Sequence, residues 1–170
     1  MTSGVDATVG PRNPRNPRNP GNPGDAWVGG DRGRFWGRFG AAGVLVHDVG
    51  RGILLQHRAT WSDQGGTWGL PGGALHQGED AVTGALREAQ EEAAVPAERI
   101  RVLFTSVFDV GYWSYTTVGA RVIRPFEPRI TDPESIELQW VPADEVAAKP
   151  LHPGFATAWP GLRRKLKSFR

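Results

Sequence analysis

The sequence contains no cysteine, so it can form neither disulfide bonds nor thiolate metal sites. That composition suits a reducing compartment, and we expect a cytoplasmic protein. No run of about 18 apolar residues occurs, so we expect no transmembrane helix. The N-terminus also lacks the apolar segment of a secretory signal. A strong excess of charge of one sign is missing, since the net charge is +2, and nucleic acid is therefore not an expected partner.

Residues 1–25 have a low-complexity composition that differs from the rest of the chain. A Pro-Arg-Asn triplet occurs three times in residues 11–19, and further Pro and Gly residues follow. Repeated Pro removes backbone donors and favours extended conformers, and nothing in this stretch can form a core. We therefore expect a disordered tail over 1–25 and a folded domain over 26–170. A solvated tail and a basic arm that touches phosphate or a partner both remain open.

The pattern of apolar residues beyond the tail predicts several strands and two helices. Strands are expected over 39–46, 53–57, 67–70, 101–109, 115–123 and 136–141. Helices are expected over 79–93 and 153–166, with a helical turn at 142–146. Pro160 and Gly161 could break the second helix. Strands mixed with two helices indicate an α+β sandwich.

Three carboxylates are concentrated on the first expected helix. Glu88, Glu91 and Glu92 stand at i, i+3 and i+4, which places them on one helical face. Such a face is often merely solvated, but a divalent cation with oxygen ligands would also relieve the charge repulsion. The preceding Pro71-Gly72-Gly73 lets the backbone turn tightly and approach a ligand closely.

These residues resemble the Nudix box, G-x5-E-x7-R-E-U-x-E-E-x-G-U, in which U is a bulky aliphatic residue. Every charged position of the box matches at its spacing. The chain departs from the pattern at Ala89, which is smaller than the usual aliphatic residue, and at Ala94, which replaces a glycine. An Ala with φ > 0 would cost on the order of 1 kcal/mol. The matching positions are Gly73, Glu79, Arg87, Glu88, Ala89, Glu91, Glu92, Ala94 and Val95.

The resemblance implies a Nudix-type α/β/α sandwich with a mixed sheet and a set of metal ligands. Glu91 and Glu92 would bind Mg²⁺, with Mn²⁺ as an alternative, and the Gly73 carbonyl could join them. Glu88 would be either a ligand or the base that activates water. Outside the box a later carboxylate often contributes, for which we select Glu134, with Glu137 as a further candidate.

Two further roles follow from the same resemblance. Arg87 would orient the glutamates, so the catalytic set consists of Glu88, Arg87 and Glu91. Glu79 would hold the loop and the helix together. Chemically, cations neutralise the diphosphate oxygens and lower the pKa of water, and a carboxylate then takes the proton.

Substrate contacts are less clearly marked in the sequence. Arg58, at the end of the second expected strand, could bind phosphate bidentately. Tyr112 lies where a tyrosine resembles the marker of dinucleoside polyphosphate hydrolases, and Trp36 and Trp61 are further candidates for stacking on a base. His57 and His152 lack the spacing of a metal pair and are expected to be packing or surface residues.

We therefore predict a Nudix pyrophosphohydrolase that cleaves nucleoside di- or triphosphates, oxidised nucleotides included, by direct water attack. The segments 61–73 and 151–155 resemble actinobacterial MutT-type proteins, which favours this substrate class. A dinucleoside polyphosphate or ADP-ribose hydrolase is the alternative enzyme. A non-catalytic nucleotide-sensing module is the alternative of another class. A small-molecule nucleotide is the expected partner, and a homodimer is left open.

Overall fold

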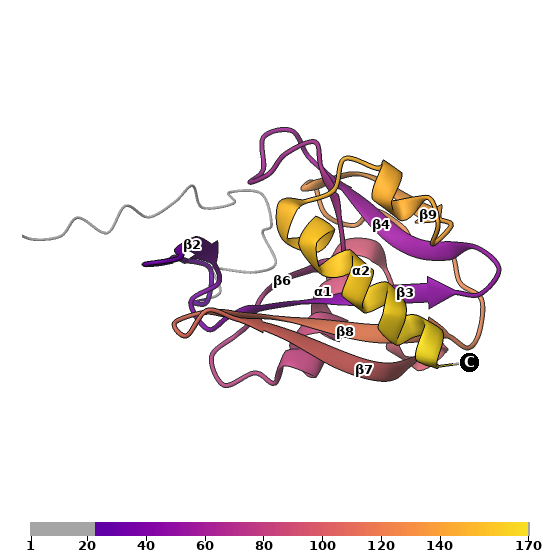
Figure 1. Cartoon of the computed structure of the whole chain (residues 1–170), viewed down its shortest axis with the longest axis horizontal. Coiled ribbons are helices and arrows are strands. Elements are labelled where there is room, and N and C mark those ends of the chain that lie inside the picture. The colour runs from indigo at the N-terminus through magenta and orange to yellow at the C-terminus, as the bar shows by residue number, and fades with distance from the viewer. Residues whose placement is uncertain (1–22, 170) are drawn as a thin grey trace, which may run out of the picture.

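The computed structural model describes residues 23–169, so the Pro-Arg-Asn repeat lies outside the described residues. Within this range the chain forms a seven-stranded sheet, a separate hairpin and two helices (Figure 1). The hairpin is β1 (Trp27–Gly30) and β2 (Gly33–Trp36), and the helices are α1 (Ala81–Ala93) and α2 (Pro153–Ser168). Two short 3₁₀ helices are η1 (Ala97–Arg99) and η2 (Val146–Ala148). The strands of the large sheet are β3 (Ala41–Asp48), β4 (Gly52–Arg58), β5 (Trp68–Gly69), β6 (Gly72–Ala74), β7 (Ile100–Asp109), β8 (Ser114–Val122) and β9 (Ser135–Val141).

The large sheet is mixed, as expected. Its main strand order is β5-β4-β3-β8-β7, while β6 pairs with β3 and β9 pairs with β4. Only β3 and β8 run parallel to each other, and every other pair in this sheet is antiparallel. A parallel pair needs a long crossover connection, and here that connection includes α1. The order of the strands therefore brings the loop before α1 to one end of β3.

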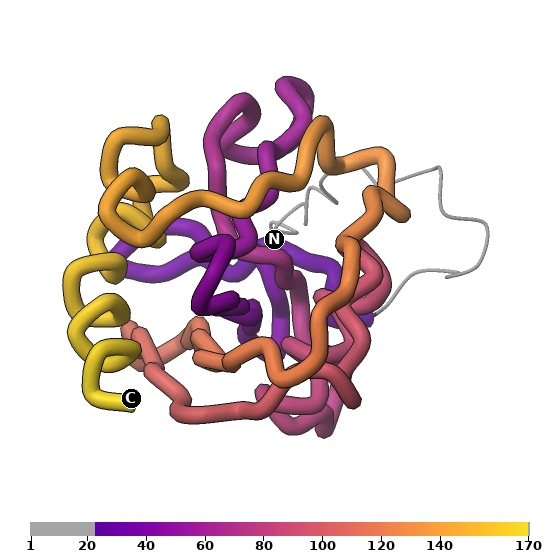
Figure 2. Tube along the Cα trace, turned by 90° about the vertical axis from the view of Figure 1, so that its right-hand side faces the viewer, coloured from indigo at the N-terminus to yellow at the C-terminus, as the bar shows by residue number. Residues whose placement is uncertain are grey.

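Each face of the sheet has its own hydrophobic core because neighbouring strand residues point to opposite sides. Leu54 of β4 packs in the core under α1, whereas Ile53 and Leu55 pack in the core under α2. Figure 2 shows the two helices on opposite sides of the strands. The α+β, α/β/α arrangement expected from the sequence is thereby confirmed. The helix residues in these cores are Ala85, Ala89 and Ala93 of α1 and Phe155, Trp159, Leu162 and Leu166 of α2.

Helix α1 begins two residues later than expected and ends where expected. Asp80 is its N-cap, and the Asp80 carboxylate accepts a hydrogen bond from the Val82 amide at 2.9 Å. Ala94 follows the helix in the left-handed region, with φ of 53°. This is the box position that usually holds glycine, so the conformational reason for glycine exists here and Ala94 carries the strain.

Helix α2 forms where the sequence predicted a helix, and Pro160 does not break it, since it runs from Pro153 to Ser168. Pro160 is exposed, while Trp159 and Leu162 are buried against the sheet and keep the helix in place. The helical turn expected at 142–146 begins at Pro142, whose carbonyl accepts from the Glu145 amide at 2.8 Å, and it continues into η2. The hairpin was not expected, because its short strands carry no strong apolar alternation.

None of the helices among residues 23–169 is long and apolar enough to cross a membrane.

Candidate active site

The loop before α1 contains two glycines that allow close backbone packing. A Cβ at Gly72 would clash with the Ala42 carbonyl of β3. A Cβ at Gly73 would lie 2.7 Å from the carboxyl carbon of Glu88. The carboxylate of Glu88 therefore lies directly against the Gly73 backbone. This contact brings Glu88 of α1 and the Gly73 peptide together.

Arg87 is the centre of the ion-pair network on α1. Its guanidinium donates to both Glu79 oxygens at 2.8 and 2.9 Å, to Glu88 at 2.8 Å and to Glu91 at 3.2 Å. It also donates to the Ala74 carbonyl at 3.2 Å. One fork-shaped side chain thus fixes the positions of three carboxylates, which is the contact pattern of an orienting residue.

Glu79 connects the loop to the helix. Besides accepting from Arg87, it accepts a hydrogen bond from the His76 amide at 3.1 Å. The hydrogen bonds from Arg87 lower the pKa of Glu79 to about 2, although partial burial acts in the opposite direction. Glu79 is therefore ionised at neutral pH and is already paired, which leaves it little capacity to bind another cation.

Glu88 and Glu92 have the opposite electrostatic environment. Burial raises the pKa of Glu88 to about 7, against the lowering effect of Arg87. Burial also raises the pKa of Glu92, and the charges of Glu88, Asp132 and Glu134 raise it further. Glu92 is only 8% exposed, and it accepts one hydrogen bond from the Gly72 amide at 3.3 Å. Two desolvated carboxylates that repel each other are stabilised by an added positive charge.

Glu91 has a third environment, since its side chain is 52% exposed. It lies on the same helical face as Glu88 and Glu92, but at the solvent end of that face. Within residues 23–169 no three acidic or histidine side chains converge closely enough to enclose a metal ion. Ion pairing with Arg87 directs Glu88 and Glu91 towards the guanidinium.

The donor set nevertheless suits Mg²⁺ or Mn²⁺. Carboxylate and carbonyl oxygens are the ligands that hard divalent cations prefer. Glu88 and Glu92, with the Gly73 backbone beside them, supply such oxygens in a buried place that lacks a full complement of positive charge. The metal-ligand roles of Gly73, Glu88, Glu91 and Glu92 therefore remain predictions that fit the local chemistry.

A second acidic group lies on the Glu92 side of the site. The Glu134 carbonyl accepts from the Ala59 amide at 2.7 Å, and its own amide donates to the Asp132 carboxylate at 2.7 Å. Both Asp132 and Glu134 influence Glu92 electrostatically. The metal-ligand role of Glu134 remains a prediction. Asp132 was missed, although it is only two residues away. Glu137 is an exposed residue of β9.

Asp25 is a further acidic residue that sequence reasoning missed. The Gly24 carbonyl accepts from the Arg38 amide at 2.8 Å, and the Ala26 carbonyl accepts from the Gly37 amide at 2.9 Å. These bonds place Asp25 within electrostatic range of Glu88 and Arg87. Specific contacts therefore begin within residues assigned to the tail. No sequence signal could have shown this, because Asp25 lies 54 residues before Glu79.

The two predicted substrate residues lie in different surroundings. Arg58 ends β4, and its Nε donates to the Asp63 carbonyl at 2.9 Å. The Tyr112 hydroxyl accepts from the Arg32 amide at 3.1 Å and donates to the Gly33 carbonyl at 2.8 Å. Tyr112 thereby fastens the hairpin to the turn between β7 and β8. The structure does not bring Tyr112 together with the box glutamates, and its role in substrate binding remains a prediction.

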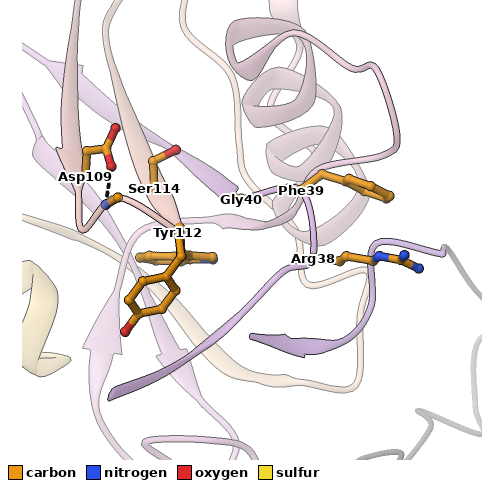
Figure 3. A pocket seen from close by; sticks show the side chains of 8 residues that line it. Arg38, Phe39, Gly40, Asp109, Tyr112 and Ser114 are labelled. Carbon is orange, nitrogen blue, oxygen red and sulfur yellow. Dashed lines mark hydrogen bonds between the residues drawn. The ribbon is translucent and has the colours of Figure 1, made fainter. Parts of the chain in front are cut away.

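A pocket beside Tyr112 lies between the β7–β8 turn and the segment before β3. Figure 3 shows Asp109 and Tyr112 on one side of it and Arg38 and Phe39 on the other. None of the box glutamates lines this pocket.

The remaining aromatic and histidine candidates have packing or capping contacts, except Trp61. Trp36 packs edge-to-face on Trp27, and Trp61 is 62% exposed. His57 stacks on Trp68 at 4.4 Å, and His152 accepts from the Gly154 amide to cap α2. His57 thus has a packing contact, and His152 caps α2, a role that the sequence did not predict.

Comparison with known proteins agrees with this arrangement. The sequence model of the NUDIX domain matches residues 37–160. A Mycobacterium tuberculosis protein named "Putative 8-oxo-dGTP diphosphatase 3" is 48% identical over 150 residues, which cover 82% of this chain and 69% of that protein. A Bifidobacterium longum nucleoside triphosphate pyrophosphatase/Nudix hydrolase fusion protein is 43% identical over 151 residues, covering 84% of this chain and 31% of the fusion.

Solved structures show the same fold. A Nudix hydrolase from Mycobacterium smegmatis, RenU, superposes with a TM-score of 0.78 at 46% identity, covering 86% of this chain and 98% of that one. A Caenorhabditis elegans Ap4A hydrolase superposes with a TM-score of 0.64 at 20% identity, covering 76% and 99%. The second similarity concerns the fold alone.

The fold and the acidic helix define a hydrolase that acts on phosphorus-containing anhydrides. The chain belongs to the Nudix family.

Proposed function

We propose that this chain is a pyrophosphohydrolase of nucleoside di- or triphosphates, oxidised nucleotides included, that depends on Mg²⁺ or Mn²⁺. The observation that carries the proposal is a pair of desolvated carboxylates beside the glycine loop: the half-buried Glu88, held by Arg87, and the buried Glu92, held by the Gly72 amide. The similarity to the M. tuberculosis protein supports the choice of substrate class.

The side chains divide the chemical work between them. A divalent cation, when bound, would neutralise phosphate oxygens and acidify water. Glu88 has a raised pKa of about 7, so it can accept the proton of the attacking water near neutral pH. Arg87 fixes the orientation of Glu88 through their 2.8 Å hydrogen bond. Arg58 presents a guanidinium that can bind a phosphate group.

Direct attack by water is part of the proposal. The chain has no cysteine, and the sequence has no serine in a nucleophile-elbow motif. Hydrolysis should therefore proceed without a covalent adduct. A triphosphate should give the monophosphate and pyrophosphate, and a diphosphate should give the monophosphate and phosphate.

The decisive experiment is a hydrolysis screen with the full chain over nucleoside di- and triphosphates, their oxidised forms, dinucleoside polyphosphates and ADP-ribose. Each substrate is tested with Mg²⁺, with Mn²⁺ and with a chelator, and the products are identified by mass spectrometry in oxygen-18 water. We expect label on one phosphorus-bearing product and no turnover with the chelator. Preferred cleavage of dinucleoside polyphosphates or ADP-ribose would overturn the substrate class. Nucleotide binding without any turnover would favour a sensing module.

Glu88→Gln tests the assignment of the base. The substitution keeps the size of the side chain but removes the proton acceptor, so kcat should fall at least 100-fold with little change in KM. Glu98→Gln, at an exposed position of η1, is the matched control and should retain wild-type kcat. A rise in KM with an unchanged kcat would make Glu88 a binding residue. The cytoplasmic location and a homodimer remain further predictions.

A further inference from the structure

The hydroxyl of Tyr115 lies where a side chain at position 43 would lie, because residue 43 is glycine. Tyr115 lies on β8, opposite Ala41 of the parallel neighbour β3. Its ring extends along β3 to Gly43, where a Cβ would clash with the Tyr115 hydroxyl. That Cβ would also lie 2.9 Å from the Pro71 carbonyl oxygen. Glycine at position 43 thus allows the tyrosine hydroxyl to reach the glycine-rich loop.

This position connects Tyr115 with the buried carboxylates. A Cβ at Gly72 would lie 2.6 Å from the Cα of Gly43, so the two glycine backbones are in close contact. The Gly72 amide in turn donates to Glu92. The backbones of two glycines, Gly43 and Gly72, therefore separate the Tyr115 hydroxyl from Glu92. Glu92 and Arg58 both act on it electrostatically.

Within residues 23–169 the Tyr115 hydroxyl forms no hydrogen bond. Burial and the charge of Glu92 raise the pKa of Tyr115, against the lowering effect of Arg58, so the group keeps its proton at every working pH. A neutral O–H near a guanidinium and a carboxylate can donate to an oxygen that bears negative charge.

We propose that the Tyr115 hydroxyl donates a hydrogen bond to a non-bridging phosphate oxygen of the substrate during hydrolysis. The inference rests on the proposed function, because it places the phosphate chain between Arg58 and the glutamates of α1. Tyr115 transfers no proton and forms no bond to phosphorus. It stabilises the charge that accumulates on the phosphate oxygen as water attacks. Gly43 is the residue that makes this contact sterically available.

Tyr115→Phe is the sharpest test, because it removes only the hydroxyl and leaves the ring in place. Loss of one donor to a charged transition-state oxygen is worth roughly 10- to 100-fold in rate. We expect kcat to fall by that factor, with KM changing less than threefold and the melting temperature within about 2 °C. Thr117→Val is the matched control. It removes a hydroxyl from the same strand and the same face, two residues further along, and should leave kcat unchanged.

A second measurement separates a phosphate contact from an effect on the cation. Mn²⁺ affinity, measured by calorimetry on the substrate-free protein, should be the same in the wild type and in Tyr115→Phe within a factor of two. A wild-type rate in Tyr115→Phe overturns the inference, as does a fall in kcat that is matched by an equal loss of Mn²⁺ affinity.

The outcome can also be distinguished from failure of the proposed function. If the wild type hydrolyses no nucleotide, the proposed function fails. The inference is then tested by calorimetric binding of inorganic pyrophosphate in the presence of Mn²⁺. Tyr115→Phe should weaken that binding by up to threefold, the same limit expected for KM, and equal binding by both proteins overturns the contact.

Discussion

Glu92→Gln should make the metal-free protein more stable while it destroys activity. In the wild type the Glu92 carboxylate is 8% exposed and receives one backbone hydrogen bond, at 3.3 Å from Gly72. Its charge is also opposed by Glu88, Asp132 and Glu134. A neutral glutamine of the same shape keeps the acceptor for Gly72 and presents an amide donor to the acidic neighbours.

The size of the effect follows from the burial of the charge. Replacing a poorly compensated buried charge by a neutral group of the same size is expected to raise the free energy of unfolding by about 1–2 kcal/mol. For a domain of this length that corresponds to roughly 3–6 °C in melting temperature. Saturating Mg²⁺ should instead make the wild type more stable than Glu92→Gln, since a cation at 100 times its Kd stabilises the wild type by about 2.7 kcal/mol. Turnover should fall by at least about 100-fold.

The pH dependence provides an independent check of the cause. Because the folded pKa of Glu92 is raised above 4.5, the folded wild type binds a proton that the unfolded chain has already lost. Wild-type stability without metal should therefore decline as pH rises from about 4.5 through the folded pKa. Below that range the acid is protonated in both states, and the advantage of the glutamine should disappear.

Differential scanning calorimetry at pH 4 and pH 8, with chelator or with Mg²⁺, measures all four conditions. Glu98→Gln removes a charge from an exposed position and should shift the melting temperature by less than about 1 °C. A metal-free Glu92→Gln protein that is less stable than the wild type at pH 8 would refute the electrostatic argument. An equal stabilisation by Mg²⁺ in both proteins would remove Glu92 from the metal ligands.

Four other changes test local features of the fold. Ala94→Gly should raise the free energy of unfolding by about 0.5–1 kcal/mol, because φ is 53° there, and a lower melting temperature would contradict this. Glu79→Gln should cost about 1–2 kcal/mol at pH 7 after solvent screening, and the loss should vanish as pH falls from 4.5 through about 2, in urea titrations of both proteins. Deletion of residues 2–22 should leave melting temperature and kcat/KM nearly unchanged. Deletion through residue 26 should lower the melting temperature, since it removes the carbonyl that binds Arg38, and equal effects of the two truncations would contradict this.

The sequence alone was sufficient for the acidic helix and its loop. Residues at i, i+3 and i+4 share a face in any α-helix, so the spacing of Glu88, Glu91 and Glu92 determines their geometry. The pairing of Arg87 with Glu91 follows from the same periodicity, and the contact is present at 3.2 Å. The sandwich of sheet and helices also followed from local patterns, because strand and helix periodicities differ.

Only the tertiary structure decided how these side chains differ from one another. Glu91 is half exposed, whereas Glu92 is buried, although the two are neighbours in sequence. Burial depends on which elements cover the helix, and spacing does not encode that. The contact of Tyr112 with the hairpin, in place of one with the box glutamates, is a further example. Its position in the sequence gave no indication of which backbone its hydroxyl would meet.

The chain path also decided which distant residues join the site. Asp25 and Asp132 lie within electrostatic range of the α1 carboxylates, and the Tyr115 hydroxyl reaches across β3 to Gly43. Such contacts join residues far apart in sequence, and they depend on strand order and register. A local motif therefore determines the chemistry that the helix can perform, while the packing of the sheet determines the charge, burial and neighbours under which each group acts.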